Sequence, residues 1–276
     1  KEYSLEINGD IEIIDPRSPE ESERRKEFAA HYSEKRKRRG ENYQTTKDRM
    51  RHRNYFGPMM VERGYADAMI SGLTTPYPET IRPALEIIGK KKGSKIVSGM
   101  YIMVTDKGPV FFADTTINMN PDVDSLVEIT LQTAEKVGLY NVIPKIALLS
   151  YSNFGSTKGR VPEMVREAVK KLHNDYPDLI VDGEMQANFA MNNELMKEFF
   201  PFSKLIDQDV NVLIFPYLSA GNIAYKLVQE MSHNEAIGPV LNGLRKSVHI
   251  LQMGSSVQEI VNMVTIAVID AQYNED

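Results

Sequence analysis

The stretch Asn54–Gly89 constrains the fold more than any other part of this chain, because it holds several structural elements with almost no linking sequence. Aromatic and methionine side chains recur there at helical spacing, and Gly64 supplies a stop. The run Ala66–Ser71 has the length of a buried strand, and Gly72 opens a loop behind it. A second helix is expected from Pro78 onward. Helix, strand, loop and helix in such quick succession predict an α/β unit.

Arg82 is expected at the start of this second helix. Backbone N–H groups at a helix N-terminus already favour an anion, so an arginine behind a glycine loop indicates a phosphate contact. A solvated surface arginine is the alternative that this stretch alone leaves open.

Further apolar runs alternate with helical patterns along the rest of the chain. Ile146–Leu149 and Val212–Phe215 are short and continuous, as expected for strands covered on both faces. Ile96–Val104 and Val110–Ala113 flank a tight turn and predict an antiparallel pair. Further helices are predicted over Ser18–Arg39, Pro121–Gly138, Pro162–His173 and Val257–Gln272. The alternation predicts an α/β fold with largely parallel sheets.

A loop rich in serine and glycine follows the strand Ile146–Leu149 and precedes a helix. Such a loop is typical of a backbone anion cradle, although an ordinary strand-to-helix connection remains open and the spacing is not that of a P-loop. Its candidate ligand-binding residues are Ser150, Ser152, Ser156 and Lys158. Asp182 and Glu184 lack a third carboxylate or histidine beside them in the sequence, so they are interpreted as loop-capping residues and no metal site is predicted.

Composition narrows the class of protein. The chain has 276 residues and no cysteine, which rules out disulfides and thiolate chemistry. No apolar run approaches the ~20 residues that a membrane helix needs, and we expect a cytoplasmic protein. Between Arg24 and Arg53 there are 12 Lys/Arg against 4 Asp/Glu, a net charge of +8 in a chain whose total is −5. This basic block suits a polyanion such as a nucleotide-bearing cofactor or is a solvated face; nucleic acid is a minor alternative, because the block lacks interleaved aromatics.

Several separated motifs resemble phosphate acetyltransferases. The clearest is Tyr55–Gly89, where MMVERGYADAMISG and the later TIRPA follow the family pattern. The form ADAMISGLTTPYPETIRPALEIIG is similar to one branch, the phosphotransacetylase-like C-terminal domain of large bacterial NADP-dependent malic enzymes. The resemblance implies two α/β subdomains flanking a cleft, as in phosphate acetyltransferase and isocitrate dehydrogenase. Residues 1–95 plus 246–276 would form the first subdomain and 96–245 the second.

The resemblance also implies a site. Arg36 matches an active-site arginine by its spacing to Arg82, and the serine-rich loop matches the family's substrate loop. Gly221 and Asn222, in a turn before a helix, match a GN motif at the cleft.

One family motif is altered in this chain. Where relatives carry Ser-Arg-Gly and an Asp six residues after the Arg, this chain has Gln252, Met253 and Glu259. Methionine has neither charge nor donor, so it cannot replace a guanidinium. Glu259 can still accept a proton, and together with Arg36 it would form a vestigial catalytic pair.

The function implied is therefore binding of acetyl-CoA or coenzyme A as a regulatory and oligomerisation module. Its partners would be a malic-enzyme catalytic domain in cis, which would carry NADP and a divalent metal on missing sequence, and further copies of the chain. A start at Lys1 rather than Met fits a domain of a longer protein. The alternative is an active phosphate acetyltransferase that moves acetyl between acetyl phosphate and coenzyme A.

Overall fold

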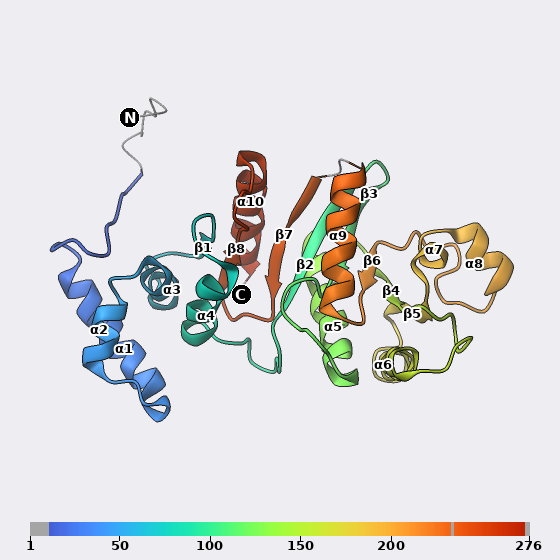
Figure 1. Cartoon of the computed structure of the whole chain (residues 1–276), viewed down its shortest axis with the longest axis horizontal. Coiled ribbons are helices and arrows are strands. Elements are labelled where there is room, and N and C mark those ends of the chain that lie inside the picture. The colour runs from blue at the N-terminus through green and yellow to red at the C-terminus, as the bar shows by residue number, and fades with distance from the viewer. Residues whose placement is uncertain (1–10, 233–234, 274–276) are drawn as a thin grey trace.

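The computed structural model describes residues 11–232 and 235–273. An N-terminal group of helices leads into a six-stranded sheet, and the last helix returns beside the first strand (Figure 1). The elements of the N-terminal part are α1 (Ser22–Arg36), η1 (Lys37–Arg39), α2 (Tyr43–Arg49), α3 (Arg53–Arg63), β1 (Ala68–Ser71) and α4 (Tyr77–Ile87). Glycine 64 ends α3 in the left-handed conformation (φ 78°), as the sequence predicted.

The six-stranded sheet has the order β5-β4-β6-β3-β2-β7. Its strands are β2 (Ser98–Thr105), β3 (Gly108–Ala113), β4 (Lys145–Leu149), β5 (Ile180–Met185), β6 (Val212–Ile214) and β7 (Glu235–Asn242). The strands β5, β4, β6 and β3 run parallel, whereas β2 pairs antiparallel with both β3 and β7. The α/β class, the parallel core and the antiparallel pair are confirmed.

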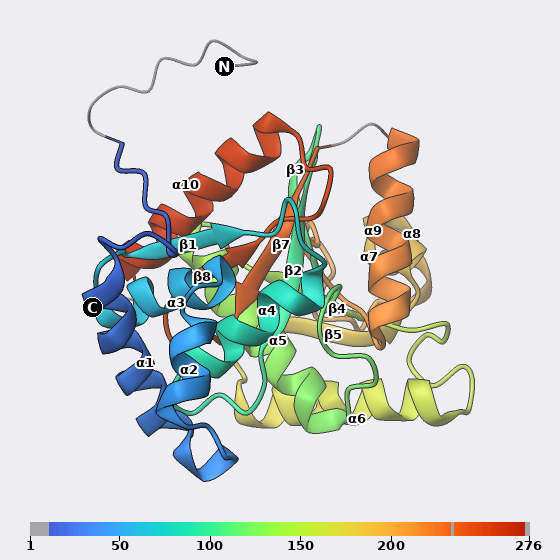
Figure 2. The ribbon, with the colours of Figure 1, turned by 60° about the vertical axis from the view of Figure 1, so that its left-hand side comes forward.

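Helices cover both faces of this sheet, and successive side chains along a strand point to opposite faces. The covering elements are α5 (Val123–Leu139), α6 (Arg160–Asp175), α7 (Ala187–Ala190), α8 (Asn193–Phe199) and α9 (Leu218–Ser232). On β2, Met100 and Ile102 pack into the core beneath α5 and α6, while Tyr101 and Met103 pack into the core beneath α9. Both sets are buried, and Figure 2 shows α9 and α6 on different sides of the strands.

Two strands from distant parts of the chain form a second sheet. β1 pairs in parallel with β8 (Ser247–Ile250), and α10 (Val257–Tyr273) packs against both strands and against β7. A separate core of residues from α1, α3, α4 and β8 surrounds this pair. The exact subdomain boundaries at residues 95 and 246 stay a prediction.

The first helix begins later than its sequence indicated. The expected start at Ser18 fails because Arg25 Nη1 donates to the carbonyls of Pro16 and Ser18, at 2.8 and 2.6 Å, and holds that segment in turns. The helix starts at Ser22 instead. Within the two described ranges, no helix is long and apolar enough to cross a membrane.

Candidate functional site

The loops singled out in the sequence gather at the carboxyl edge of the parallel strands. β3, β4 and β6 are parallel neighbours, so the loops that follow them begin at the same edge of the sheet. This is where open α/β sheets bind ligands. The segment after β8 also reaches this edge, because Gln252 contacts residues of β2 and α9.

Two adjoining hollows lie here. Hollow A has a volume of about 310 Å³ and is lined by Thr75, Tyr77, Thr116, Asn222, Leu251, Gln252 and Met253. Hollow B has a volume of about 300 Å³ and is lined by Tyr101, Gly238, Gln252, Met253, Gly254, Ser255, Glu259 and four residues of α9, namely Tyr225, Lys226, Gln229 and Glu230. Both hollows contain Gln252 and Met253, so these residues stand between them. The structure thus forms a cleft between the segments that follow β1 and β8 on one side and α9 on the other.

Gln252 bridges the two sides of this cleft through hydrogen bonds. Its Nε2 donates to the hydroxyl of Tyr101 at 2.7 Å and to that of Tyr225 at 3.0 Å. The two tyrosine rings are stacked with centroids 3.8 Å apart. Burial, and then the neighbouring Tyr225, raise the pKa of Tyr101, so its hydroxyl stays neutral. A glutamine at this position therefore makes a defined structural contact that a serine side chain is too short to make.

Met253 and Glu259 both line hollow B but differ in their surroundings. The Met253 side chain is 66% exposed. Glu259 caps α10: Ser256 N–H donates to its Oε2 at 2.7 Å. The carboxylate that the resemblance assigned to proton transfer thus has a structural partner.

Gly221 and Asn222 are the fourth and fifth residues of α9 rather than part of a turn before it, which corrects the sequence expectation. A Cβ at Gly221 would lie 2.6 Å from the carbonyl oxygen of Asp114, so only glycine lets α9 pack this closely on the end of β3. Asn222 lines hollow A, and its Nδ2 donates to the Thr115 carbonyl at 3.2 Å.

Asp114, which the sequence analysis missed, organises the loop after β3. Its buried carboxylate accepts hydrogen bonds from the N–H groups of Gly99, Thr116, Ile117 and Asn118. Three of these donors follow Asp114 within four residues, whereas Gly99 lies on the neighbouring strand β2, so the sequence alone does not show that contact.

The serine-rich loop holds an internal carboxylate. Glu184 is fully buried, and its Oε1 accepts hydrogen bonds from Ser152 Oγ at 2.9 Å and from Gly155 N–H at 2.8 Å. Arg166 contributes two further bonds, at 3.0 and 3.2 Å. Burial alone would raise the pKa of Glu184, but the hydrogen bonds from Arg166, Gly155 and Ser152 outweigh it and lower that pKa. In this loop one backbone N–H, that of Gly155, binds an anionic group, and that group is the chain's own Glu184.

The other candidate ligand-binding residues of this loop make fewer or longer hydrogen bonds. Ser156 Oγ lies 3.2 Å from Ser152 Oγ and accepts from Asn153 N–H. Ser150 Oγ accepts from Ser152 N–H at 3.4 Å, and Lys158 is exposed. Their predicted role in ligand binding stays a prediction.

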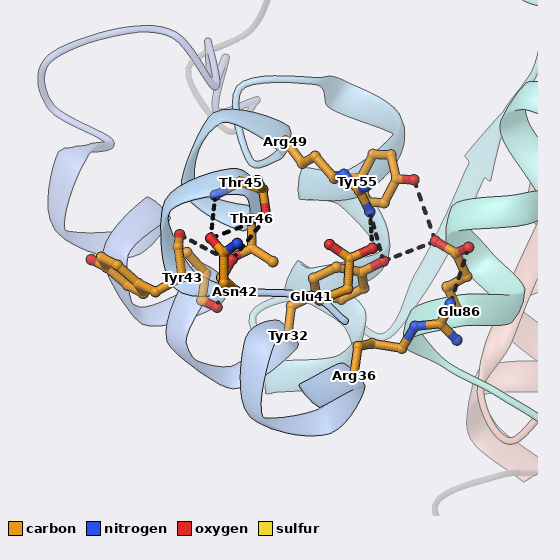
Figure 3. A network of polar contacts seen from close by, with 11 residues as sticks. Tyr32, Arg36, Glu41, Asn42, Tyr43, Thr45, Thr46, Arg49, Tyr55 and Glu86 are labelled. Atoms are coloured by element: carbon orange, nitrogen blue, oxygen red, sulfur yellow. Dashed lines mark hydrogen bonds and ion pairs between the residues drawn. The ribbon is translucent and has the colours of Figure 1, made fainter. Parts of the chain in front are cut away.

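Arg36 pairs with Glu86 of α4, the helix that also carries Arg82. Arg36 Nη2 lies 3.3 Å from Glu86 Oε1, and Tyr32 donates to the other carboxylate oxygen at 2.9 Å (Figure 3). Arg82 is exposed and stands four residues before Glu86, on the same face of α4. It is the sixth residue of the helix, not its first, so the expected position at the helix start is wrong. Neither arginine lines hollow A or hollow B.

No group of three or more histidine or carboxylate side chains that could hold a metal ion occurs in the residues that the structure describes. Asp182 accepts from Ser203 Oγ and Lys204 N–H, in agreement with the loop-capping interpretation.

Comparisons with known proteins point to the same protein family. A family model described as phosphate acetyl/butaryl transferase matches residues 1–268. The chain is 38% identical to a phosphate acetyltransferase of Clostridium acetobutylicum over 279 residues, which cover 99% of this chain and 84% of that protein. It is also 38% identical to an NADP-dependent malic enzyme of Haemophilus influenzae over 264 residues, which cover 95% of this chain but 34% of that protein.

Solved structures agree. The EutD phosphotransacetylase from Staphylococcus aureus superimposes with a TM-score of 0.85 at 34% identity, covering 98% of this chain and 81% of that one. A phosphotransacetylase from Streptococcus pyogenes gives 0.84 at 35% identity, covering 94% and 78%. The chain belongs to the phosphate acetyl/butaryl transferase family.

Proposed function

We propose that the cleft formed by hollows A and B binds coenzyme A and an acyl phosphate, and that the chain is a phosphate acetyltransferase. The observation that carries this proposal is the match to phosphate acetyltransferases over almost the whole chain, with the adjoining hollows at the edge where such sheets bind ligands. Acetyl transfer to a thiol needs a proton acceptor and positive charge for the phosphate. Glu259 lines hollow B together with Met253 and is the candidate proton acceptor. Arg36 and Arg82, which line neither hollow, are candidate phosphate contacts by the family resemblance.

A second candidate is binding without efficient turnover. It is favoured by Met253, which places a neutral side chain where the family resemblance expects an arginine, and by the capping contact that engages Glu259. The malic-enzyme relative gives this candidate a context, because the chain covers about a third of it. In that case acetyl-CoA would act as a regulatory ligand, and NADP and a divalent metal would belong to a separate catalytic domain.

One assay separates the two candidates. Purified chain is mixed with acetyl phosphate and coenzyme A, and thioester formation is followed by absorbance. Turnover comparable with that of a family member of known activity supports the transferase. If calorimetry shows that acetyl-CoA binds, but thioester formation is at least ~10²-fold slower than in that family member, the regulatory module is supported. If neither ligand binds, both candidates are wrong.

Arg82 is tested in the same calorimetry. Arg82→Ala should weaken coenzyme A binding by about 1–3 kcal/mol, as for charge-assisted hydrogen bonds. Lys107→Ala, an exposed cation in the turn between β2 and β3, is the control and should leave the affinity unchanged. Equal affinity of the Arg82 variant and the wild type would remove Arg82 from the site.

A further inference from the structure

Tyr77 carries a buried hydroxyl with no hydrogen-bond partner in the described part of the chain. It is the first residue of α4, between Pro76 and Pro78, and its side chain lines hollow A. The two prolines restrict the backbone on either side of Tyr77, so the backbone position from which its ring extends is well defined. Buried polar groups in folded proteins nearly always have partners, so an unpaired hydroxyl on a side chain that lines a cavity points to a missing hydrogen-bond acceptor.

The lining of hollow A defines the kind of atom that fits. None of its side chains is charged, and its polar groups belong to Thr75, Tyr77, Thr116, Asn222 and Gln252. The charge that acts on the Tyr77 hydroxyl is the carboxylate of Asp114, which would repel a phosphate. A neutral acceptor is therefore favoured over an anion.

Tyr77 can act as a donor throughout the physiological range. Burial, and then the negative charge of Asp114, raise the pKa of Tyr77, so the hydroxyl remains protonated. The N-terminal end of α4 adds a partial positive charge on the same side, which also favours an electron-rich oxygen.

We propose that Tyr77 donates a hydrogen bond to a carbonyl oxygen of the bound ligand. Within the proposed function, on which this inference rests, that oxygen belongs either to the acyl group or to an amide of the pantetheine arm. Tyr77 is then a specificity-determining contact of this chain, and it supplies a neutral donor in the cleft where Met253 supplies none.

The test is Tyr77→Phe, which removes only the hydroxyl. The unliganded variant should melt at a higher temperature than the wild type, because an unpaired buried group is deleted. Its affinity for the ligand should nevertheless fall about three- to tenfold, the worth of one hydrogen bond. Removal of a hydroxyl that serves only the fold would change the melting temperature but leave the ligand affinity unchanged.

Tyr140→Phe is the matched control. Tyr140 has a second buried hydroxyl without a partner in the described residues, at the end of α5, and it lines neither hollow A nor hollow B. Its variant should also melt higher but bind ligand like the wild type.

Calorimetry with acetyl-CoA and with coenzyme A distinguishes the two sources of the carbonyl. Loss for acetyl-CoA alone assigns the acyl oxygen, and equal loss for both ligands assigns a pantetheine amide. If the wild type binds both ligands and Tyr77→Phe binds them equally well, the Tyr77 inference is overturned while the proposed function stands. A lower melting temperature of unliganded Tyr77→Phe also overturns it. If the wild type binds neither ligand, the proposed function fails and the inference fails with it.

Discussion

Ser256 and Glu259 cap the first turn of α10 reciprocally. Ser256 N–H donates to Glu259 Oε2 at 2.7 Å, and Glu259 N–H donates to Ser256 Oγ at 3.1 Å. This is a capping box, in which two otherwise unpaired N–H groups are satisfied. Because α10 packs on β1, β7 and β8, its first turn links the cleft to both sheets.

The cap predicts how variants at Glu259 separate structure from chemistry. Glu259→Ala should lower the free energy of unfolding by about 0.5–2 kcal/mol, as for the loss of a helix cap. Glu259→Gln should keep most of that stability, because glutamine also suits the third helical position. Urea denaturation of the three proteins measures the difference.

Thioester formation is then compared between wild type and Glu259→Gln. A rate loss in a variant of unchanged stability would assign proton transfer to the carboxylate. Equal rates would leave Glu259 with its capping role alone.

A second prediction concerns the pH dependence of stability through Glu184. Its pKa in the folded chain is lowered from 4.5, so its contribution is fully present above pH 4.5. Below that value the unfolded chain takes up the proton first, and stability falls as the pH approaches the folded pKa. Glu184→Gln should therefore flatten the acid limb of the stability curve measured by urea denaturation at a series of pH values.

Glu184→Gln should also lower stability at pH 7, by about 1–3 kcal/mol, because the charge-assisted bonds from Arg166, Ser152 and Gly155 weaken. Glu167→Gln is the control: it lies on α6, is exposed and has no ion pair among the described residues. An acid limb as steep as that of the wild type would show that Glu184 does not titrate as stated.

Local pattern explains why much of the fold could be predicted from the sequence. The strand Ile146–Leu149 is a continuous apolar run because it is covered on both faces, and Gly64 ends its helix because it adopts a positive φ. The Ser256–Glu259 spacing was equally visible as a capping box, but the family resemblance gave Glu259 a chemical role instead.

The site depends more on distant partners, which a linear pattern does not encode. Glu184 meets Ser152 across 32 positions, and Arg36 meets Glu86 across 50. The sequence suggests that Gly221 is a turn residue. Its actual role, the close approach to the carbonyl of Asp114, is visible only in the structure. Among the residues predicted from the sequence, Asn222, Gln252, Met253 and Glu259 line the cleft, whereas the serine-rich loop does not. The roles of individual side chains depend on tertiary contacts.

A third prediction is that the chain self-associates through α10. The sequence analysis expected further copies of the chain as partners. The structure shows an exposed apolar stripe on the last helix, at spacings of four, three and four, formed by Val257, Val261, Val264 and Val268. The other exposed residues of this helix are Gln258, Thr265, Gln272 and Tyr273, so none of them is charged. A two-fold contact places like residues near each other, and a face without charge avoids the repulsion that this brings.

Light scattering at micromolar concentration should show that the chain is a dimer or a larger oligomer. The double variant Val261→Glu/Val264→Glu should be a monomer. Ile143→Glu, which changes an exposed residue in the loop before β4, should leave the assembly intact. A clean monomer for the wild type would contradict this prediction.

The last prediction concerns Met253, where a cation is expected to restore acetyl transfer. Met253→Arg should raise the rate of thioester formation by up to about 10², the usual worth of one preorganised electrostatic contact. The side chain is 66% exposed, so the change should cost little stability. Adding Glu259→Asp should help only if the shorter carboxylate improves proton transfer more than it weakens the cap of α10.

Met191→Arg is the control, since Met191 is also exposed and lies in the turn after α7. It should change neither rate nor stability, which separates a local electrostatic effect from a general increase in positive charge. Robust turnover by the unmodified chain would show that Met253 does not limit the reaction, and the regulatory candidate would then fail. If Met253→Arg and the double variant both remain inactive while acetyl-CoA still binds, the missing charge is not what separates binding from catalysis. The short contacts of Gln252 with Tyr101 and Tyr225 would then be the next feature of the cleft to alter, because they fix the distance between its two sides.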